Sequence, residues 1–208
     1  MRHGFEDSTI FVRSFVFRTV VPGAHDNRRD RELLGGLASG RAEALAELYD
    51  RHVASLFRHA LMLARHRPDA EDLVQAVFVK LATTGAELLG VREPASYLHR
   101  MLHTTWIDGQ RRRATGERAA EHTEHGTTAW AGPRHGGPEG AIDIARALEA
   151  LPPAQREAIL LHLIEGFSFR EIGRLTGVSL FTAAGRYRLG IRRPRASLGA
   201  QRTTHETS

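Results

Sequence analysis

Histidines are the first side chains of this sequence that could support chemistry, because the chain contains twelve of them. His99 and His103 are spaced i, i+4, which would place two imidazoles on one helix face as a possible metal-ligand pair. His122 and His125 lie three residues apart. No carboxylate motif completes either pair in the manner of a zinc-protease helix. We therefore favour surface histidines over a metal site.

Three acids, Asp69, Glu71 and Asp72, could form an acid–base or Mg²⁺ cluster. Acids this close together on a helix point in different directions, so we favour a binding face over a catalytic one. The chain has no cysteine, which excludes disulfides, thiolate catalysis and cysteine-ligated metals. It also has no glycine-rich phosphate loop and no serine nucleophile elbow. We expect no enzyme activity and no cofactor, and we keep an enzyme only as a remote alternative.

Basic charge is concentrated near the C-terminal end of the chain. The whole chain has a net charge of +5, but residues 173–202 contain seven arginines and no acid. These arginines are Arg174, Arg186, Arg188, Arg192, Arg193, Arg195 and Arg202. A segment of one charge sign indicates a polyanionic partner, with nucleic acid preferred over a membrane surface.

The elements that must position these residues begin with a helix predicted over residues 68–81. At roughly 100° per residue, its apolar side chains fall on one arc. They are Ala70, Leu73, Val74, Val77, Phe78 and Leu81. The outward positions are Asp69, Glu71, Asp72, Gln75 and Val79. Pro68 is expected just before the helix, and acids suit its first turns. An acidic first turn followed by an exposed Gln75 and Val79 favours docking onto a basic partner. The alternative is an ordinary amphipathic helix.

Three more helices are predicted in the N-terminal half of the chain. The first contains Leu33, Leu34 and Leu37, and the others span residues 42–65 and 94–113. The segment between residues 84 and 94 is predicted to be a loop. Four helices joined by short turns form one compact domain over residues 27–113.

The segments outside the predicted domains have a different character. Residues 1–26 contain an apolar run that Arg13 and Arg18 interrupt, so it is too short and too charged for a membrane span, and no signal-peptide cleavage site follows it. We interpret this part as a poorly ordered extension. Residues 114–140 are rich in Gly, Thr, Glu, His and Pro and are predicted to be a flexible linker. Residues 199–208 form a tail.

A second helical domain is predicted over residues 141–198, so the fold class is all-α with two small domains. Helices are expected over residues 142–151 and 154–164, with a break at Gly166. Helix-turn-helix features follow. Ser168 and Glu171 have capping-box spacing, and Gly173 is small where a second helix must cross closely. Gly177 suits a left-handed turn residue.

Ser179 can cap the second helix of this motif, which should enter the major groove of DNA. Its outer positions include Thr182, Arg186 and Arg188, and Pro194 is expected to end it. The alternative is a plain helical hairpin with a basic surface.

Several motifs together resemble bacterial RNA polymerase sigma factors of the extracytoplasmic-function (ECF) group, which has only the second and fourth conserved regions. The polymerase-binding motif of the second region is similar to Asp69-Ala70-Glu71-Asp72-Leu73-Val74-Gln75. The other matching segments are residues 44–49, 95–100, 108–112, 151–157 and the helix-turn-helix. The resemblance covers about residues 30–198 and implies a cytoplasmic protein that recruits polymerase to promoters.

The resemblance implies a role for each set of residues. Asp69, Glu71, Asp72, Gln75 and Val79 should dock on the clamp helices of the largest polymerase subunit. The segment 84–94 and the following helix should capture and melt the minus-ten promoter element. The implied DNA contacts there are Tyr97, Arg100, His103, Thr104, Trp106, Arg111, Arg112 and Arg113. Aromatic rings and arginines can stack on unpaired bases while arginines hold phosphates.

The resemblance also implies roles for the C-terminal half. The linker should thread toward the active-site channel of the polymerase. The helix-turn-helix should read the minus-thirty-five element while its apolar side contacts the flap of the second-largest subunit. The implied DNA contacts are Ser179, Thr182, Arg186, Arg188 and Arg192. An anti-sigma factor is a further candidate partner, and membrane insertion is not expected.

The sequence departs from the family pattern at several positions. Ala76 replaces the acid that usually follows the glutamine. In the recognition helix the family usually has Thr-Val-Lys/Arg-Ser-Arg-Leu, whereas this chain has Thr182-Ala183-Ala184-Gly185-Arg186-Tyr187. A basic residue and a serine are therefore missing, and Gly185 lowers helix propensity by about 1 kcal/mol relative to Ala. These changes predict altered or weak minus-thirty-five recognition.

The main alternative function is a helix-turn-helix transcriptional regulator with a helical sensor or dimerisation domain. Such a regulator would bind duplex DNA tightly on its own, whereas a sigma factor needs core polymerase. It would also have no use for an acidic helix face that exposes Gln75 and Val79.

Overall fold

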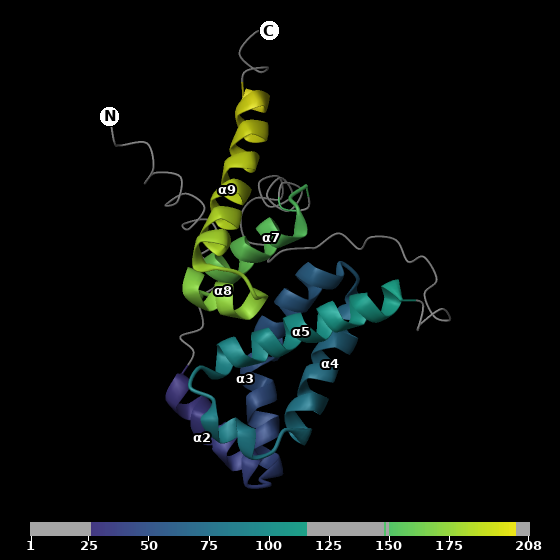
Figure 1. The fold of residues 1–208 in the computed structure, drawn as a ribbon, viewed down its shortest axis with the longest axis vertical. Coiled ribbons are helices and arrows are strands. Elements are labelled where there is room, and N and C mark those ends of the chain that lie inside the picture. Colours follow the sequence, from purple (N-terminus) through teal and green to yellow (C-terminus); the bar gives the residue numbers. More distant parts are fainter. Residues whose placement is uncertain (1–25, 116–147, 149, 203–208) are drawn as a thin grey trace. The chain divides into compact units, whose positions relative to one another are not determined.

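The computed structural model describes residues 26–115, 148 and 150–202 of the 208-residue chain, with side chains as far as Arg192. These residues form helices and no strand, in two compact units, as the sequence predicts (Figure 1). The predicted N-terminal extension, most of the linker and most of the predicted helix over residues 142–151 lie outside the described residues. None of the described helices is long and apolar enough to cross a membrane.

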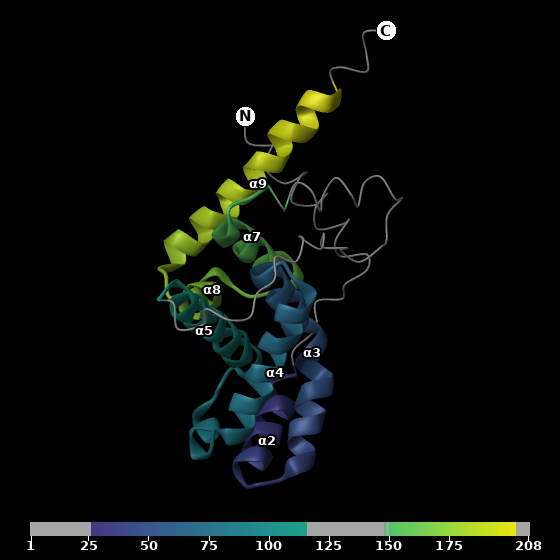
Figure 2. The same cartoon turned by 90° about the vertical axis from the view of Figure 1, so that its right-hand side faces the viewer.

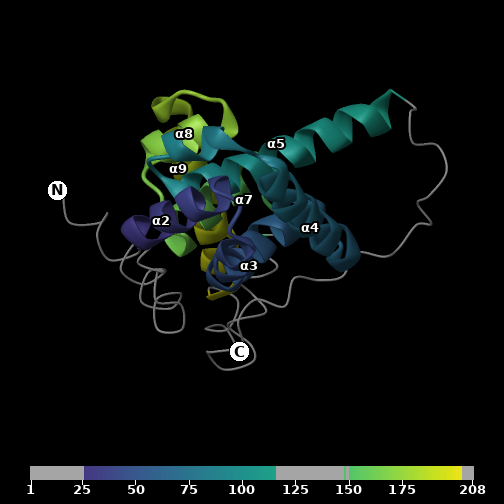
Figure 3. The same cartoon turned by 90° about the horizontal axis from the view of Figure 1, so that it is seen from below.

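The N-terminal domain is built around one long helix. This helix, α3 (Ala42–Ala64), contacts α2 (Asn27–Ala38), α4 (Arg67–Thr83) and α5 (Pro94–Ala114). Figure 3 views α3 nearly along its axis and shows the last turns of α5 extending beyond the other helices of the domain. The segment predicted as a loop between residues 84 and 94 instead contains a 3-10 helix, η1 (Ala86–Gly90). It buries Leu88 in the core of the domain.

The apolar side of α4 packs into the core of this domain as predicted. Its six buried residues are the six expected from helical periodicity, Ala70, Leu73, Val74, Val77, Phe78 and Leu81. The other helices contribute fully buried leucines to the same core, which are Leu34, Leu48, Leu56, Leu98 and Leu102. Pro68 differs from the expectation, because α4 begins at Arg67 and places the proline inside the first turn. A proline is tolerated there because first-turn N–H groups have no partner within the helix.

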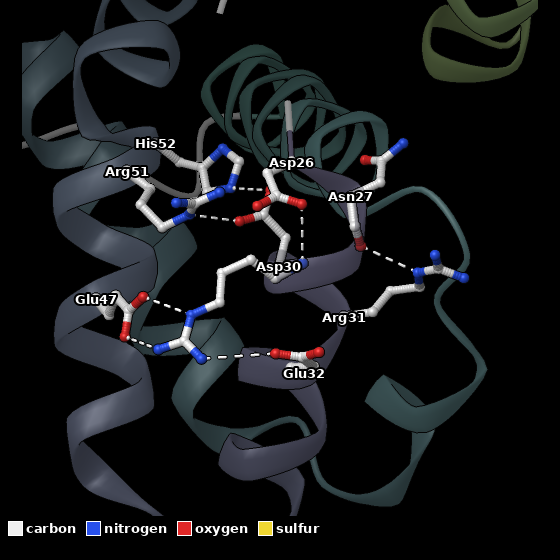
Figure 4. A network of polar contacts seen from close by, with 9 residues as sticks. Asp26, Asn27, Asp30, Arg31, Glu32, Glu47, Arg51 and His52 are labelled. Atoms are coloured by element: carbon white, nitrogen blue, oxygen red, sulfur yellow. Dashed lines mark hydrogen bonds and ion pairs between the residues drawn. The ribbon is translucent and has the colours of Figure 1, made fainter. Parts of the chain in front are cut away.

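A buried carboxylate joins α2 to α3 (Figure 4). The Asp30 side chain is fully buried, and its Oδ1 accepts a hydrogen bond of 2.6 Å from Arg51 Nε. Its Oδ2 lies 3.0 Å from His52 Nε2. Burial raises the pKa of Asp30, but hydrogen bonds and positive charge from His52 and Arg51 lower it by more, so the net pKa is below its ordinary value. The carboxylate is therefore stabilised as an anion inside the folded domain.

His99 is a core residue, which corrects its interpretation as a surface histidine. Its ring is fully buried, with Nδ1 3.0 Å from His59 Nδ1 and Nε2 2.8 Å from Ser55 Oγ. The two imidazoles are also stacked, with centroids 5.1 Å apart. Both ring nitrogens of His99 therefore serve contacts between α3 and α5.

The C-terminal domain contains α7 (Pro153–Ile159), the π-helical turn η2 (Leu160–Ile164), α8 (Phe169–Thr176) and α9 (Leu180–Arg202). The α-helix predicted over residues 154–164 therefore changes to π-helical geometry in its second half. The predicted end of the last helix at Pro194 is wrong, because α9 continues to Arg202 (Figure 2). A proline removes one backbone donor, but its fixed φ is close to the helical value.

The turn between α8 and α9 has the predicted geometry. Ser168 N–H donates to Glu171 Oε2 at 2.8 Å, and Glu171 N–H donates to Ser168 Oγ at 3.3 Å, so the capping box is formed. Gly177 has a φ of +70°. Thr182 N–H donates to Ser179 Oγ at 3.0 Å, which caps the start of α9. A Cβ added to Gly173 would lie 2.8 Å from the backbone oxygen of Val178.

The buried carboxylate of Asp30 should make the free energy of unfolding depend on pH. Asp30→Asn should lower the free energy of unfolding at pH 7 by about 1.5–3 kcal/mol, since charged hydrogen bonds to Arg51 and His52 are lost. Because the folded pKa of Asp30 is lowered, its contribution is present above the unfolded pKa of about 4 and is lost as pH falls through the folded value. Urea unfolding between pH 3 and pH 7 should therefore show the two proteins converging in acid.

Glu47→Gln is the matched control, because Glu47 pairs with Arg29 at an exposed site. It should change the stability far less, since water and salt screen an exposed ion pair. Equal effects of the two substitutions at pH 7 would contradict the importance of the buried carboxylate.

The close approach at Gly173 predicts that even one methyl group is not tolerated. Gly173→Ala should destabilise the C-terminal domain by about 1–3 kcal/mol, because backbone atoms of the turn would have to move. Gly185→Ala in α9 is the control, since its added Cβ has no neighbour within 4 Å. This control should stabilise the helix by about 1 kcal/mol. Thermal unfolding followed by circular dichroism measures both, and a Gly173→Ala protein as stable as the wild type would refute the steric argument.

Candidate protein and nucleic-acid interfaces

One candidate interface is the outward side of α4, which we call the acidic face and define by Asp69, Glu71, Asp72, Gln75 and Val79. Glu71, Asp72, Gln75 and Val79 are exposed, and Val79 keeps 60% of its surface in contact with solvent. Asp69 is only half-buried, and its Oδ1 lies 3.7 Å from His66 Nδ1. The six core residues on the opposite side fix this orientation. The structure thus brings the five predicted residues together on one helix.

The acidic face contains one internal ion pair. Arg67 Nε donates to Glu71 Oε1 at 2.8 Å, and both side chains are exposed. An i, i+4 pair of this kind contributes only a few tenths of a kcal/mol. Glu71 can therefore exchange Arg67 for a basic group of a partner at little cost.

A second candidate interface lies along α5, where aromatic rings and arginines form pairs. The guanidinium carbon of Arg100 lies 5.6 Å from the Tyr97 ring centroid, and that of Arg113 lies 5.9 Å from the Trp106 centroid. Tyr97 and Trp106 are half-buried, so one part of each ring packs on the domain while the rest is accessible. Such rings, held in place and flanked by cations, can stack on unpaired bases.

The basic end of α5 continues this interface. Arg111 and Arg112 are exposed, while Arg113 is half-buried. Arg111 Nη1 lies 3.9 Å from Asp108 Oδ1. Arg112 Nε donates to the backbone oxygen of Asp108 at 3.3 Å. These last turns extend beyond the rest of the domain (Figures 1 and 3), which makes their cations available to a phosphate backbone. The remaining predicted residues of this helix are His103, which is half-buried, and Thr104, which is exposed.

The third candidate interface is the outer side of α9. Ser179, Thr182, Arg188 and Arg192 are exposed, whereas Arg186 is half-buried. The structure adds an apolar residue that the sequence analysis missed, because Phe181 is 80% exposed at the second position of the helix. The sequence alone does not show which side of α9 is buried. In the structure Ala183 is buried, so Phe181, about 200° around the helix axis from it, lies on the opposite side.

Aromatic packing behind α9 fixes the direction of this outer side. The Tyr187 ring meets His162 edge-on at 4.8 Å between centroids and lies 5.2 Å from Phe169. Gly190 allows close approach to α7, because a Cβ there would lie 2.8 Å from Ile159 Cδ1. The inner side of α9 is thereby buried, and the outer side faces away from α7.

The histidine pairs that the sequence suggests as metal ligands do not form a metal site within the described residues. Among them, no group of three or more His, Asp or Glu side chains is arranged to hold a metal ion. The His99 ring of the predicted i, i+4 pair is already engaged by Ser55 and His59. His122 and His125 lie outside the residues that the structure describes.

Comparison with known proteins places both domains in one family. Residues 48–115 match sigma-70 region 2, and residues 141–193 match sigma-70 region 4. RNA polymerase sigma factor CarQ of Myxococcus xanthus is 30% identical over 164 residues, which cover 77% of this chain and 92% of CarQ. ECF RNA polymerase sigma factor SigE of Mycolicibacterium smegmatis is 32% identical over 152 residues, or 69% of this chain and 57% of SigE.

Two solved structures share the fold of this chain. The structure of CnrH in complex with the cytosolic domain of CnrY has a TM-score of 0.58 at 25% identity and covers 83% of this chain and 98% of that one. The sigma factor RpoE from Bartonella quintana, solved with the anti-sigma factor NepR, shares the fold with a TM-score of 0.60 at 22% identity, over 74% of this chain and 96% of RpoE. With both sigma-70 regions matched and CarQ matched over 92% of its length, the chain belongs to the ECF group of RNA polymerase sigma factors.

Proposed function

We propose that this protein binds core RNA polymerase through the acidic face of α4 and directs it to specific promoters. The observation that carries this proposal is the orientation of α4, whose buried side is entirely apolar and whose exposed side combines acids with Gln75 and Val79. Acids around an exposed valine fit a partner surface with basic groups around an apolar patch. The clamp helices of the largest polymerase subunit are the proposed partner surface.

The α5 interface is proposed to capture and melt the minus-ten element. The pairs Tyr97–Arg100 and Trp106–Arg113 supply rings and cations for unpaired bases, and Arg111 and Arg112 supply phosphate contacts. This combination suits a single strand better than a closed duplex, because stacking requires bases to leave the helix. The protein itself catalyses no reaction in this proposal.

The outer side of α9 is proposed to bind the minus-thirty-five element as a duplex. Hydrogen-bond donors to bases or phosphates are supplied by Thr182, Arg186, Arg188 and Arg192. Ser179, the N-cap of α9, is proposed to contact the DNA backbone. The apolar side of the same domain is proposed to contact the flap of the second-largest subunit. An anti-sigma factor is a proposed regulator, since RpoE was solved in complex with one. With these roles, the protein is proposed to act in the cytoplasm.

Charge reversal on the acidic face tests the docking proposal. Asp72→Lys should weaken binding to core RNA polymerase by about tenfold, because it places like charges opposite each other. Fluorescence anisotropy of the labelled full chain titrated with core enzyme measures the affinity. Asp50→Lys, the same change at an exposed site on α3, is the control and should bind as the wild type does. Unchanged affinity of a correctly folded Asp72→Lys protein would exclude this face.

Truncation of an arginine on α9 tests the DNA-reading proposal. Arg186→Ala should reduce initiation by about tenfold at promoters that depend on the upstream element. This corresponds to ~1.4 kcal/mol, within the ~1–3 kcal/mol expected for one lost base contact. Abortive transcription by the holoenzyme measures this, and a promoter with a scrambled upstream element is the control that should not respond. If only promoter melting were impaired, α9 would not be the recognition helix.

A further inference from the structure

The exposed phenylalanine on α9 is the feature that the proposed function leaves unexplained. Phe181 is 80% exposed, the largest value among the large apolar side chains that the structure describes as exposed. It is the second residue of α9, and the Ser179 cap fixes where that helix begins. Single exposed apolar residues are common, so exposure alone assigns no role. Its position on the helix is what gives it one.

Phe181 lies opposite the buried side of α9. Ala183 is fully buried and Gly190 is buried against α7. At roughly 100° per residue, both lie about 180–200° around the helix axis from Phe181. The ring therefore lies on the line of the helix that faces furthest away from the domain, and it cannot enter the core without a rotation of the whole helix.

The same outward line carries a glycine and two arginines. Gly185, Arg188 and Arg192 lie within about 40° of Phe181 around the axis. Both arginines are exposed, and a Cβ on Gly185 would meet nothing within 4 Å. The line thus begins with an aromatic ring, continues with a position that has no side chain, and ends with two cations.

These neighbours indicate duplex DNA as the occupant. Residues 173–202 contain no acid, so no residue of this segment repels a phosphate backbone. The first residues of a recognition helix contact base edges in the major groove. The only apolar group that bases present there is the C5-methyl of thymine, which phenylalanine can contact. Gly185 lets the helix approach the bases closely beside the ring.

We propose that Phe181 reads a thymine of the minus-thirty-five element through its C5-methyl group. The inference rests on the proposed function and names a specificity residue for it. Polar readout is reduced in this helix, because Ala184 and Gly185 offer no hydrogen-bonding side chain. An apolar contact at Phe181 supplies base discrimination in their place.

Removal of single methyl groups from DNA tests this contact. In a promoter that the wild-type holoenzyme uses, each thymine of the upstream element is replaced in turn by deoxyuridine, which keeps all hydrogen bonds. At one or two positions, wild-type holoenzyme should bind about fourfold more weakly, which corresponds to ~0.8 kcal/mol for one buried methyl. Phe181→Ala holoenzyme should bind the natural promoter at least about fourfold more weakly and should lose the deoxyuridine effect.

Leu189→Ala is the matched control, because Leu189 is 54% exposed on the same helix, two turns further along. Its holoenzyme should keep the full deoxyuridine effect. An equal deoxyuridine effect in wild type and Phe181→Ala would overturn the proposal. Loss of the deoxyuridine effect in Leu189→Ala would also overturn it, and so would an upstream element without any A·T pair. Failure of the wild-type chain to form a holoenzyme or initiate transcription would instead contradict the proposed function itself.

Discussion

One-sided burial of helices is the constraint on which the rest of this structure depends. In α4 the six apolar residues enter the core with α3 and α5, and this fixes the acids, Gln75 and Val79 on the outside. The same rule places Tyr97 and Trp106 at the edge of α5, half in the core and half accessible. The binding faces of the N-terminal domain are therefore what remains after its core has formed.

In the C-terminal domain, two glycines allow the close packing that orients α9. Gly173 lets the chain return tightly after α8, and Gly190 lets α9 approach α7 closely. Together with the Ser179 cap, these contacts set both the first residue of α9 and its rotation about its axis. The rotation decides that Phe181, Arg188 and Arg192 face outward. A change in packing at either glycine would therefore redirect the residues proposed to read DNA.

Strongly periodic and locally capped features could be predicted from the sequence. The buried side of α4, the capping box at Ser168 and the left-handed Gly177 depend on neighbours within a few residues, and the structure confirms them. Features that depend on distant partners could not be. His99 is buried by Ser55 and His59, which are at least 40 residues away. The exposed ring of Phe181 likewise depends on how α9 packs on α7. The roles of the proposed contact residues stay predictions.

Dependence on core polymerase most directly tests the proposal that this chain delivers polymerase to promoters. The measurement combines the purified full chain with core RNA polymerase and a library of promoter fragments, and records binding and the fragments that are transcribed. The proposal predicts a stable complex with core enzyme, selective initiation, and only weak binding of duplex DNA by the chain alone. Tight duplex binding by the chain alone, with no binding to core polymerase, would contradict it and support a helix-turn-helix regulator.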